Sequence, residues 1–395
     1  MSSMRVLFVI NGLGTGGAER SLAESLPILV NEGVEPIIVT LRRRSEGVEE
    51  MVHSAGYDLR SMDGLGWAER IRNVRRLVHT ERPDLVHTTI FEADVAGRIA
   101  AWCTGVPVLT TLVNTSYVRE RLADPNVDRM KLAAVRHIDA WTSRHLTDHF
   151  HAITKAVRDE AAACLRIPLE RFTVIERGRD PVRLGTRSRT RRHDARRRLG
   201  IGESAEVLLN VGRQEYQKGQ RFLLKAVASL AGSRPRTVLL IAGRKGHASA
   251  ELRELHEALD LGDRVRFLGH RDDVPELMAA ADVFVFPSLY EGLGGAVIEA
   301  MALGLPVVAS DLPALREVVE HGRSGLLVPP RSPQAIADAV AAVLDAPDRA
   351  QSMGARGRTI FEERFTLERS ALRMVALYRS VARNPSQARV PTSSK

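Results

Sequence analysis

Two carboxylates and two cations follow buried strands in the second half of the chain. Glu291 lies in a glycine-rich turn after an apolar run, and Glu299 follows within the apolar stretch Val-Ile-Glu-Ala-Met. Arg213 and Lys218 lie on a short loop that ends in Gly219, before a helical pattern. Carboxylates accept hydrogen bonds from sugar or ribose hydroxyls, and two cations beside a helix N-terminus suit a diphosphate. These residues predict a site for a phosphorylated, hydroxyl-rich ligand.

Each of these groups also has a simpler interpretation. Glu291 could serve the macrodipole of the following helix, and Arg213 and Lys218 could be ordinary cations of a solvated loop. The macrodipole does not account for Glu299, whose neighbours are apolar.

A second glycine-rich loop follows the first apolar run of the chain. Gly12, Gly14 and Gly17 match the pattern G-x-G-x-x-G, in which glycines let the backbone approach an anionic ligand at a helix N-terminus. The carboxylate that would bind adenosine ribose is missing after the second strand, which runs into Arg42-Arg43-Arg44. The loop therefore fits a phosphate ligand, an NADP site that uses these arginines, or a plain tight turn.

Short apolar runs alternate with longer helical patterns, which predicts parallel sheets covered by helices. The predicted strands cover residues 5–10, 36–41, 84–88, 107–112, 151–154, 172–176, 206–211, 237–242, 264–268, 281–286, 305–309 and 325–328. We predict two Rossmann-like α/β domains facing across a cleft. The predicted divisions are a first domain at 1–180, an arginine-rich linker at 181–204, a second domain at 205–364, a helix at 365–383 and a disordered tail at 384–395. Because ligands bind at the carboxyl ends of parallel strands, the site is expected between the domains.

The net charge of the chain is concentrated in one segment. The formal charge is +9, and residues 177–198, with ten Arg and two Asp, contribute +8 of it. This distribution excludes a basic surface that wraps nucleic acid. It leaves a solvated linker, an arginine-biased composition, or a contact with an anionic membrane surface.

The rest of the composition indicates an intracellular protein. Two cysteines make a disulfide framework improbable, and no signal peptide pattern or 18-residue apolar run is present. We therefore expect a cytoplasmic chain, with peripheral contact at the inner face of the membrane if the arginine segment binds lipid.

The motifs resemble those of a known family, the retaining glycosyltransferases of family 4 with the GT-B fold. The resemblance rests on Arg213 and Lys218-Gly, on Glu291 and Glu299 separated by seven residues, and on the following Ala-Met-Ala-x-Gly-x-Pro-Val-Val-Ala. Gly16-Gly17-Ala-Glu and the segments that begin at Gly269, Pro287 and Glu320 are also similar, so the resemblance spans nearly the whole chain.

The resemblance implies a role for each matching residue. Arg213 and Lys218 would hold the diphosphate and stabilise the leaving group, Glu291 would face the donor sugar, and Glu299 would bind the ribose hydroxyls. Further donor contacts are implied at Gly16, Gly17, Arg271, Gly294, Gly295 and Ala296, with Arg271 in the loop along the base. The resemblance also implies that the first domain, 1–180, binds the acceptor and that the second domain, 205–364, binds the nucleotide-sugar. The last helix would cross back to the first domain.

The expected chemistry is sugar transfer from a UDP- or GDP-sugar to a glycan, lipid-linked or small-molecule acceptor, with retention and with no metal or other cofactor. No Asp-x-Asp and no metal-spaced cluster occurs, and Arg213 and Lys218 can supply the positive charge.

Two departures from the family pattern stand out. Asn114 is the nearest polar acceptor-side residue where many relatives have a His, and Arg177-Gly178-Arg179-Asp180 replaces the usual Asn-Gly-Val-Asp. The alternatives are an NAD(P)-dependent oxidoreductase and a non-catalytic protein that binds anionic surfaces.

Overall fold

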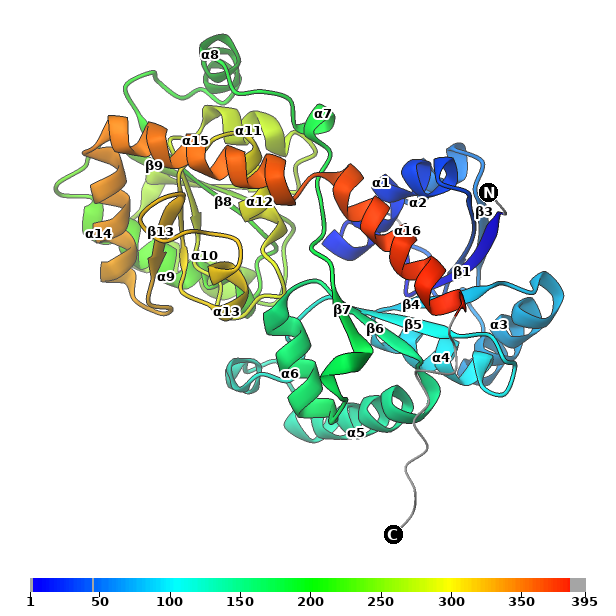
Figure 1. Cartoon of the computed structure of the whole chain (residues 1–395). Helices are drawn as coiled ribbons and strands as arrows, with labels where there is room; N and C mark the ends of the chain where they lie inside the picture. The colour runs from blue at the N-terminus through cyan, green and yellow to red at the C-terminus, as the bar shows by residue number, and fades with distance from the viewer. Residues whose placement is uncertain (1–2, 45, 384–395) are drawn as a thin grey trace. The chain divides into compact units, whose positions relative to one another are not determined.

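The computed structural model describes residues 3–44 and 46–383; the predicted tail at 384–395 lies outside the described residues. The chain forms two compact α/β units. Of the described residues, unit 1 comprises those up to Tyr117, Asp128–Gly178 and those from Thr366 on. Unit 2 comprises Val118–Val127 and Arg179–Phe365. The predicted fold class, two parallel-sheet α/β domains, is confirmed (Figure 1).

Unit 1 is built on a seven-stranded parallel sheet in the order β3-β2-β1-β4-β5-β6-β7. Its strands are β1 (Met4–Ile10), β2 (Val34–Thr40), β3 (Asp58–Ser61), β4 (Leu85–Thr89), β5 (Val108–Leu112), β6 (His149–Ala152) and β7 (Phe172–Val174). Its helices are α1 (Gly17–Asn31), α2 (Glu49–Ser54), α3 (Trp67–Glu81), α4 (Phe91–Ala101), α5 (Arg129–Leu146), α6 (Lys155–Leu165) and α16 (Leu367–Arg383), with a 3-10 turn η2 (Leu169–Arg171).

Unit 2 is built on a six-stranded parallel sheet in the order β10-β9-β8-β11-β12-β13. Its strands are β8 (Glu206–Val211), β9 (Thr237–Ala242), β10 (Val265–Gly269), β11 (Val283–Phe286), β12 (Val307–Ser310) and β13 (Gly325–Val328). Its helices are α7 (Pro181–Leu184), α8 (Arg189–Arg198), α9 (Gln220–Leu230), α10 (Ser249–Ala258), α11 (Val274–Ala280), α12 (Gly295–Ala302), α13 (Pro313–Arg316), α14 (Pro333–Leu344) and α15 (Pro347–Arg364). Short 3-10 turns are η1 (Arg119–Ala123), η3 (Tyr216–Lys218) and η4 (Gly262–Arg264).

The continuous apolar strands are buried on both faces of their sheets. In β1, Phe8 packs with α1 and α16, whereas Val9 faces the other way and joins the cluster of α3 and α4. This burial on two faces is the reason for a continuous apolar run instead of alternation. The sequence analysis missed β3, an edge strand with the sequence Asp-Leu-Arg-Ser, because its charged residues leave no apolar run.

The last helix belongs to unit 1, as predicted. Ala371, Val375 and Tyr378 of α16 are buried in the same cluster as Leu26 of α1, and the two helices lie side by side (Figure 1). Residues far apart in the sequence thus complete one core.

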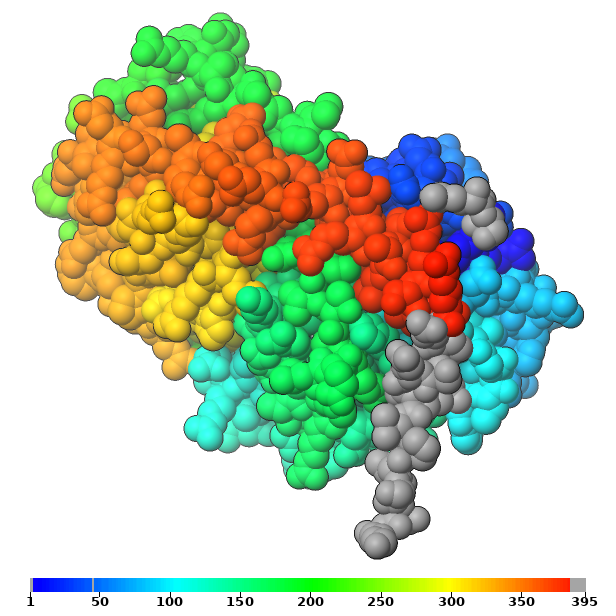
Figure 2. Space-filling model, viewed as in Figure 1, coloured from blue at the N-terminus to red at the C-terminus, as the bar shows by residue number. Residues whose placement is uncertain are grey.

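From Arg179 on, the arginine segment lies in unit 2 and includes the helices α7 and α8. Helix α8 contacts α11 and lies at the surface (Figure 2). Arg191 binds Glu276, Arg192 and Arg196 bind Asp282, and Arg187 donates to the carbonyl of Ala281. Most of the segment's cations therefore serve packing within unit 2.

Candidate functional site

The strand order of unit 2 brings the two predicted loops together. Strands β8 and β11 are neighbours in the sheet although far apart in sequence, so the loops at their carboxyl ends meet. This is the point where strand order reverses, the usual ligand site of an open parallel sheet. Lys218 follows β8 and Glu291 follows β11.

Lys218 and Glu291 form an ion pair at this edge. The Lys218 Nζ lies 2.5 Å from the Glu291 Oε1, and the Ser288 hydroxyl donates to the same oxygen at 2.8 Å. The Lys218 ammonium also lies over the ring of Phe286, 5.1 Å from its centroid. Both side chains of the pair are largely buried, so Lys218 is not an ordinary cation of a solvated loop.

Backbone contacts hold these two loops in register. The Leu289 amide donates to the Gln217 carbonyl and the Gln217 side chain donates to the Tyr290 carbonyl, each at 2.7 Å. Gly219 has a φ of +61°, and a Cβ there would collide with the carbonyl of Pro287. Only glycine fits this approach, so Gly219 is required for the site to form.

A buried polar pair supports the site from below. The Asn210 side-chain Nδ2 donates to the Val285 carbonyl at 2.8 Å, and the Gln220 side-chain Nε2 donates to the Asn210 Oδ1 at 2.9 Å. Sequence reasoning missed Asn210, Gln217, Gln220 and Ser288. An Asn inside the apolar run Glu-Val-Leu-Leu-Asn-Val was the available signal, since buried polar groups need partners.

Glu299 lies on α12, one turn after the helix begins. Its Oε1 accepts from the Arg179 Nε at 2.8 Å, and the Arg183 Nη2 lies 3.6 Å from the same oxygen. Gly294 precedes α12 with a φ of +83° and makes no side-chain cap hydrogen bond, and Gly295 and Ala296 follow it. Backbone N–H groups at such an end suit phosphate or hydroxyl oxygens.

Two other predicted residues have partners elsewhere. Arg213 is 62% exposed and lies 3.9 Å from the Glu215 Oε1, so it does not join the Lys218 pair. Arg271 follows β10 and binds Asp273 through two hydrogen bonds of 2.7 and 2.6 Å. The bond from Arg271 lowers the pKa of the Asp273 carboxyl and keeps that group charged.

The remaining predicted residues belong to unit 1. Gly16 precedes α1, Gly17 begins it, and no side chain caps this helix. The Glu19 carboxylate lies where a Cβ on Gly16 would stand, so the first turn carries its own acidic group. The Asn114 Oδ1 accepts from the Thr115 amide at 3.0 Å.

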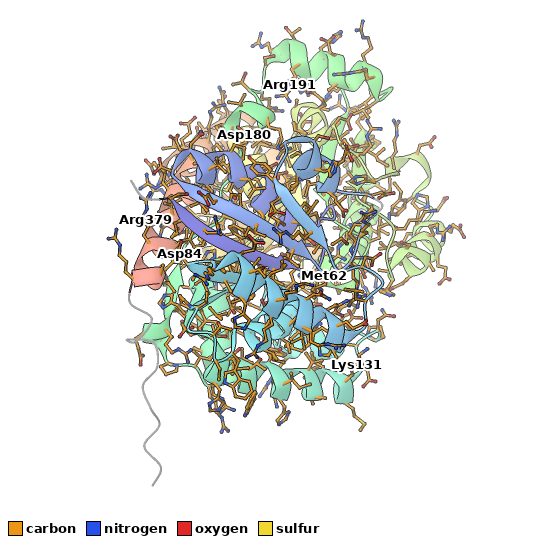
Figure 3. The ribbon with its side chains drawn as sticks, turned by 90° about the vertical axis from the view of Figure 1, so that its right-hand side faces the viewer. Met62, Asp84, Lys131, Asp180, Arg191 and Arg379 are labelled. Atoms are coloured by element: carbon orange, nitrogen blue, oxygen red, sulfur yellow. The ribbon has the colours of Figure 1, made fainter. Side chains whose placement is uncertain are left out.

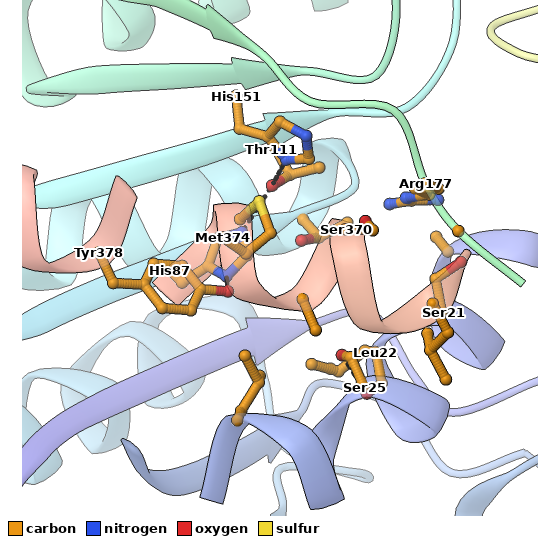
Figure 4. Close-up of a pocket in the computed structure, with 16 residues that line it drawn as sticks. Ser21, Leu22, Ser25, His87, Thr111, His151, Arg177, Ser370, Met374 and Tyr378 are labelled. Carbon is orange, nitrogen blue, oxygen red and sulfur yellow. Dashed lines mark hydrogen bonds between the residues drawn. The ribbon is translucent and has the colours of Figure 1, made fainter. Parts of the chain in front are cut away.

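Unit 1 also contains a pocket between α1, α16 and the sheet, lined by both apolar and polar side chains (Figure 4). A continuous hydrogen-bonded series crosses it. Since the Ile175 carbonyl can only accept, His151 donates to it through Nε2 at 2.8 Å. Burial lowers the pKa of both histidines and keeps their rings neutral. With neutral rings, Thr111 donates to the His151 Nδ1, His87 donates to Thr111, and Tyr378 donates to the His87 Nδ1, so the series ties α16 to the sheet.

Burial makes this series sensitive to pH. Desolvation lowers the pKa of His87 to about 3 and that of His151 to about 4. The unfolded chain, with a His pKa near 6.5, binds protons first as the pH falls, so this stabilisation is complete above ~pH 6.5 and declines below it.

A His87→Gln variant is expected to lose about 1–3 kcal/mol of unfolding free energy at pH 7.5, because its partners are left unpaired. At pH 5.5 the loss should be smaller by about 1.4 kcal/mol, because only the wild type has His87 to protonate on unfolding. Asp94 and Glu160, whose pKa values burial raises to about 7, titrate in both proteins and cancel. Urea unfolding at both pH values measures this; an equal loss would contradict it.

Among residues 3–44 and 46–383, no cluster of His, Cys, Asp and Glu could hold a metal ion. None of the helices within these residues is long and apolar enough to span a bilayer.

Two parallel-sheet α/β units are the architecture of the GT-B glycosyltransferases, and solved structures of that class match this chain in fold. Residues 191–360 match the family described as Glycosyl transferases group 1, and residues 15–183 match Glycosyltransferase Family 4. The chain therefore belongs to the family 4, group 1 glycosyltransferases, and its resemblance to that family is confirmed.

Individual relatives agree with this assignment. The lipopolysaccharide core biosynthesis mannosyltransferase LpsB of Rhizobium meliloti is 32% identical over 65% of this chain and 74% of its own length. The D-inositol 3-phosphate glycosyltransferase of Thermobispora bispora is 31% identical over 75% of this chain and 70% of its own. The structure of Anabaena Alr3699/HepE in complex with UDP-glucose has a TM-score of 0.82 and 22% identity, and covers 95% of this chain and 99% of its own.

Proposed function

We propose that the chain transfers a hexose-type sugar from a UDP- or GDP-sugar to an acceptor hydroxyl with retention of configuration. The pair of Lys218 and Glu291 beside the uncapped N-terminus of α12 carries the proposal. HepE, whose structure is titled as a UDP-glucose complex, has the same fold, and the matching relatives are named as sugar transferases. Membership of this family argues against the two alternative functions, an NAD(P)-dependent oxidoreductase and a non-catalytic protein that binds anionic surfaces.

The residues divide the chemistry between them. The bond from the anomeric carbon to the diphosphate oxygen breaks as the acceptor oxygen bonds to the same face of that carbon. The acceptor proton passes to the departing diphosphate oxygen. Lys218 and the α12 amides stabilise the charge on that group, which is how the site can work without a metal. Glu291 accepts from donor sugar hydroxyls, and Arg213 reaches the diphosphate from its exposed position.

Thermal unfolding with added nucleotides tests the donor class. UDP or GDP at 100 times its dissociation constant should stabilise the protein by about 2.7 kcal/mol, whereas NAD(P) should not. Release of free sugar from a panel of UDP- and GDP-sugars then identifies the donor. Stabilisation by NAD(P) alone would contradict the proposal.

We also propose that the chain works in the cytoplasm and contacts the inner membrane face through α5. Met130, Ile138 and Trp141 of α5 are 85%, 50% and 51% exposed and share one side of the helix. The cations Arg129, Lys131, Arg136 and Arg144 accompany them, and Figure 3 shows Lys131 directed away from the ribbon. The acidic residue of α5, Asp139, points inward and binds Arg98. A cationic helix with an exposed apolar stripe fits an anionic lipid surface.

Vesicle sedimentation tests this face against the arginine segment, whose cations mostly bind within unit 2. The wild type should bind vesicles rich in phosphatidylglycerol at low salt, and Ile138→Ser with Trp141→Ser should weaken binding at least about tenfold. Leu169→Ser, an exposed apolar site off this face, and Arg197→Met on α8 should have little effect. If Arg197→Met abolished binding and the α5 variant did not, the contact would lie on α8.

A further inference from the structure

Arg179 is a buried cation next to the donor site of unit 2. Only 6% of it is exposed, and its Nε donates to the Glu299 Oε1 at 2.8 Å. It stands in the segment where this chain departs from the family pattern, as Arg-Gly-Arg-Asp. A charged residue on such a loop would ordinarily be exposed, so the burial of the Arg179 guanidinium needs an explanation.

The backbone holds Arg179 in place from both sides. Its own amide donates to the Phe365 carbonyl at 2.8 Å, and Asp180 caps α7 by accepting from the Val182 amide at 2.8 Å. Its guanidinium then packs on Gly295, the first residue of α12, where a Cβ would lie 3.1 Å from the guanidinium carbon and closer still to one of its nitrogens. Glycine at this position makes room for Arg179.

Electrostatics alone would oppose this arrangement. The N-terminus of α12 carries partial positive charge, so a guanidinium beside it is unfavourable unless a carboxylate offsets it. Glu299 is that carboxylate. Arg179 and Arg183 both contact the Glu299 Oε1, so neither of these contacts occupies Oε2.

We propose that Arg179 is a positioning residue that holds the Glu299 carboxylate in one orientation and directs Oε2 to a ribose hydroxyl of the donor. The inference rests on the proposed function, since it assumes a nucleotide donor. A carboxylate fixed before the ligand arrives loses less rotamer freedom on binding, and hydrogen bonds to a charged acceptor are the stronger ones. The consequence is discrimination between ribose and deoxyribose, which Arg179 controls without touching the nucleotide.

Calorimetric titration with UDP, GDP and ADP first identifies the nucleotide that the wild type binds most tightly. The same nucleotide is then compared with its 2′-deoxy and 3′-deoxy forms. We expect the wild type to prefer the ribonucleotide over at least one deoxy form by about 10- to 100-fold. Arg179→Met should weaken ribonucleotide binding about tenfold, leave deoxynucleotide binding nearly unchanged, and so bring the ratio towards one.

Two further variants separate positioning from a structural or phosphate-binding role. Arg179→Lys should restore part of the ratio, because it keeps the charge but not the planar fork. Gly295→Ala, whose Cβ would displace the guanidinium, should lower the ratio even if Arg179→Met fails to fold. If Arg179→Met weakened ribo- and deoxynucleotides equally, or changed neither, the inference would be overturned while the proposed function stood. A wild type that bound no nucleoside diphosphate would overturn both.

Discussion

Replacing Lys218 with methionine is expected to lower kcat/KM for the sugar donor about 10²- to 10³-fold, the usual effect of losing one preorganised donor to developing charge. The Lys218 ammonium is buried against Phe286 and paired with Glu291, so its position is set before the donor binds. Methionine keeps most of the length of the side chain and removes its charge and its N–H donors. Steady-state kinetics with the donor identified above measures the loss.

Lys225 on α9 offers a matched control, because it is exposed and lies outside the loops of the site. Lys225→Met should retain wild-type kinetics. Lys218→Met also leaves Glu291 buried without its cation, so adding Glu291→Gln should recover stability but not activity. Activity of Lys218→Met within about threefold of wild type would show that Lys218 does not stabilise the leaving group.

The second large effect is on stability, at Arg196. This side chain is fully buried, and it donates to the Ala280 carbonyl at 3.0 Å and to the Asp282 Oδ2 at 2.7 Å. It also donates to three carbonyls of the turn before β8, those of Gly202, Glu203 and Ala205. Arg196→Met should cost about 3–5 kcal/mol, because Asp282 loses one of its two arginine partners and these carbonyls lose a buried donor. Chemical denaturation of the two proteins measures the difference.

Arg197 is the neighbour in sequence and the contrasting case. Its side chain is 74% exposed and lies 3.5 Å from Asp194, so Arg197→Met should change stability by less than about 0.5 kcal/mol. Equal losses of stability at the two positions would mean that the arginine segment stabilises the protein through its overall charge instead of through the hydrogen bonds of Arg196.

The fold class could be predicted from the sequence because buried parallel strands have a local signature. Runs such as Val-Leu-Phe-Val-Ile are apolar throughout, since both faces of the strand are covered. Strand β3 escaped prediction because an edge strand does not need two apolar faces, and its Asp58 and Arg60 bind each other at the surface. The residue types of the candidate donor site could also be predicted from the sequence, because glycines, cations and carboxylates cluster directly after strands.

What the sequence by itself determined was therefore the inventory: alternating strands and helices, Lys218, Glu291 and Glu299 after strands, and an arginine-rich segment at 177–198. Only the tertiary structure decided the partners. The strand order placed Lys218 beside Glu291, the turn into α7 brought Arg179 to Glu299, and α8 buried Arg196 against Asp282. The physical reason is that the charge of a side chain follows from its residue type, which the sequence states directly. An ion pair depends instead on which segments, tens to more than a hundred residues apart, the fold brings into contact.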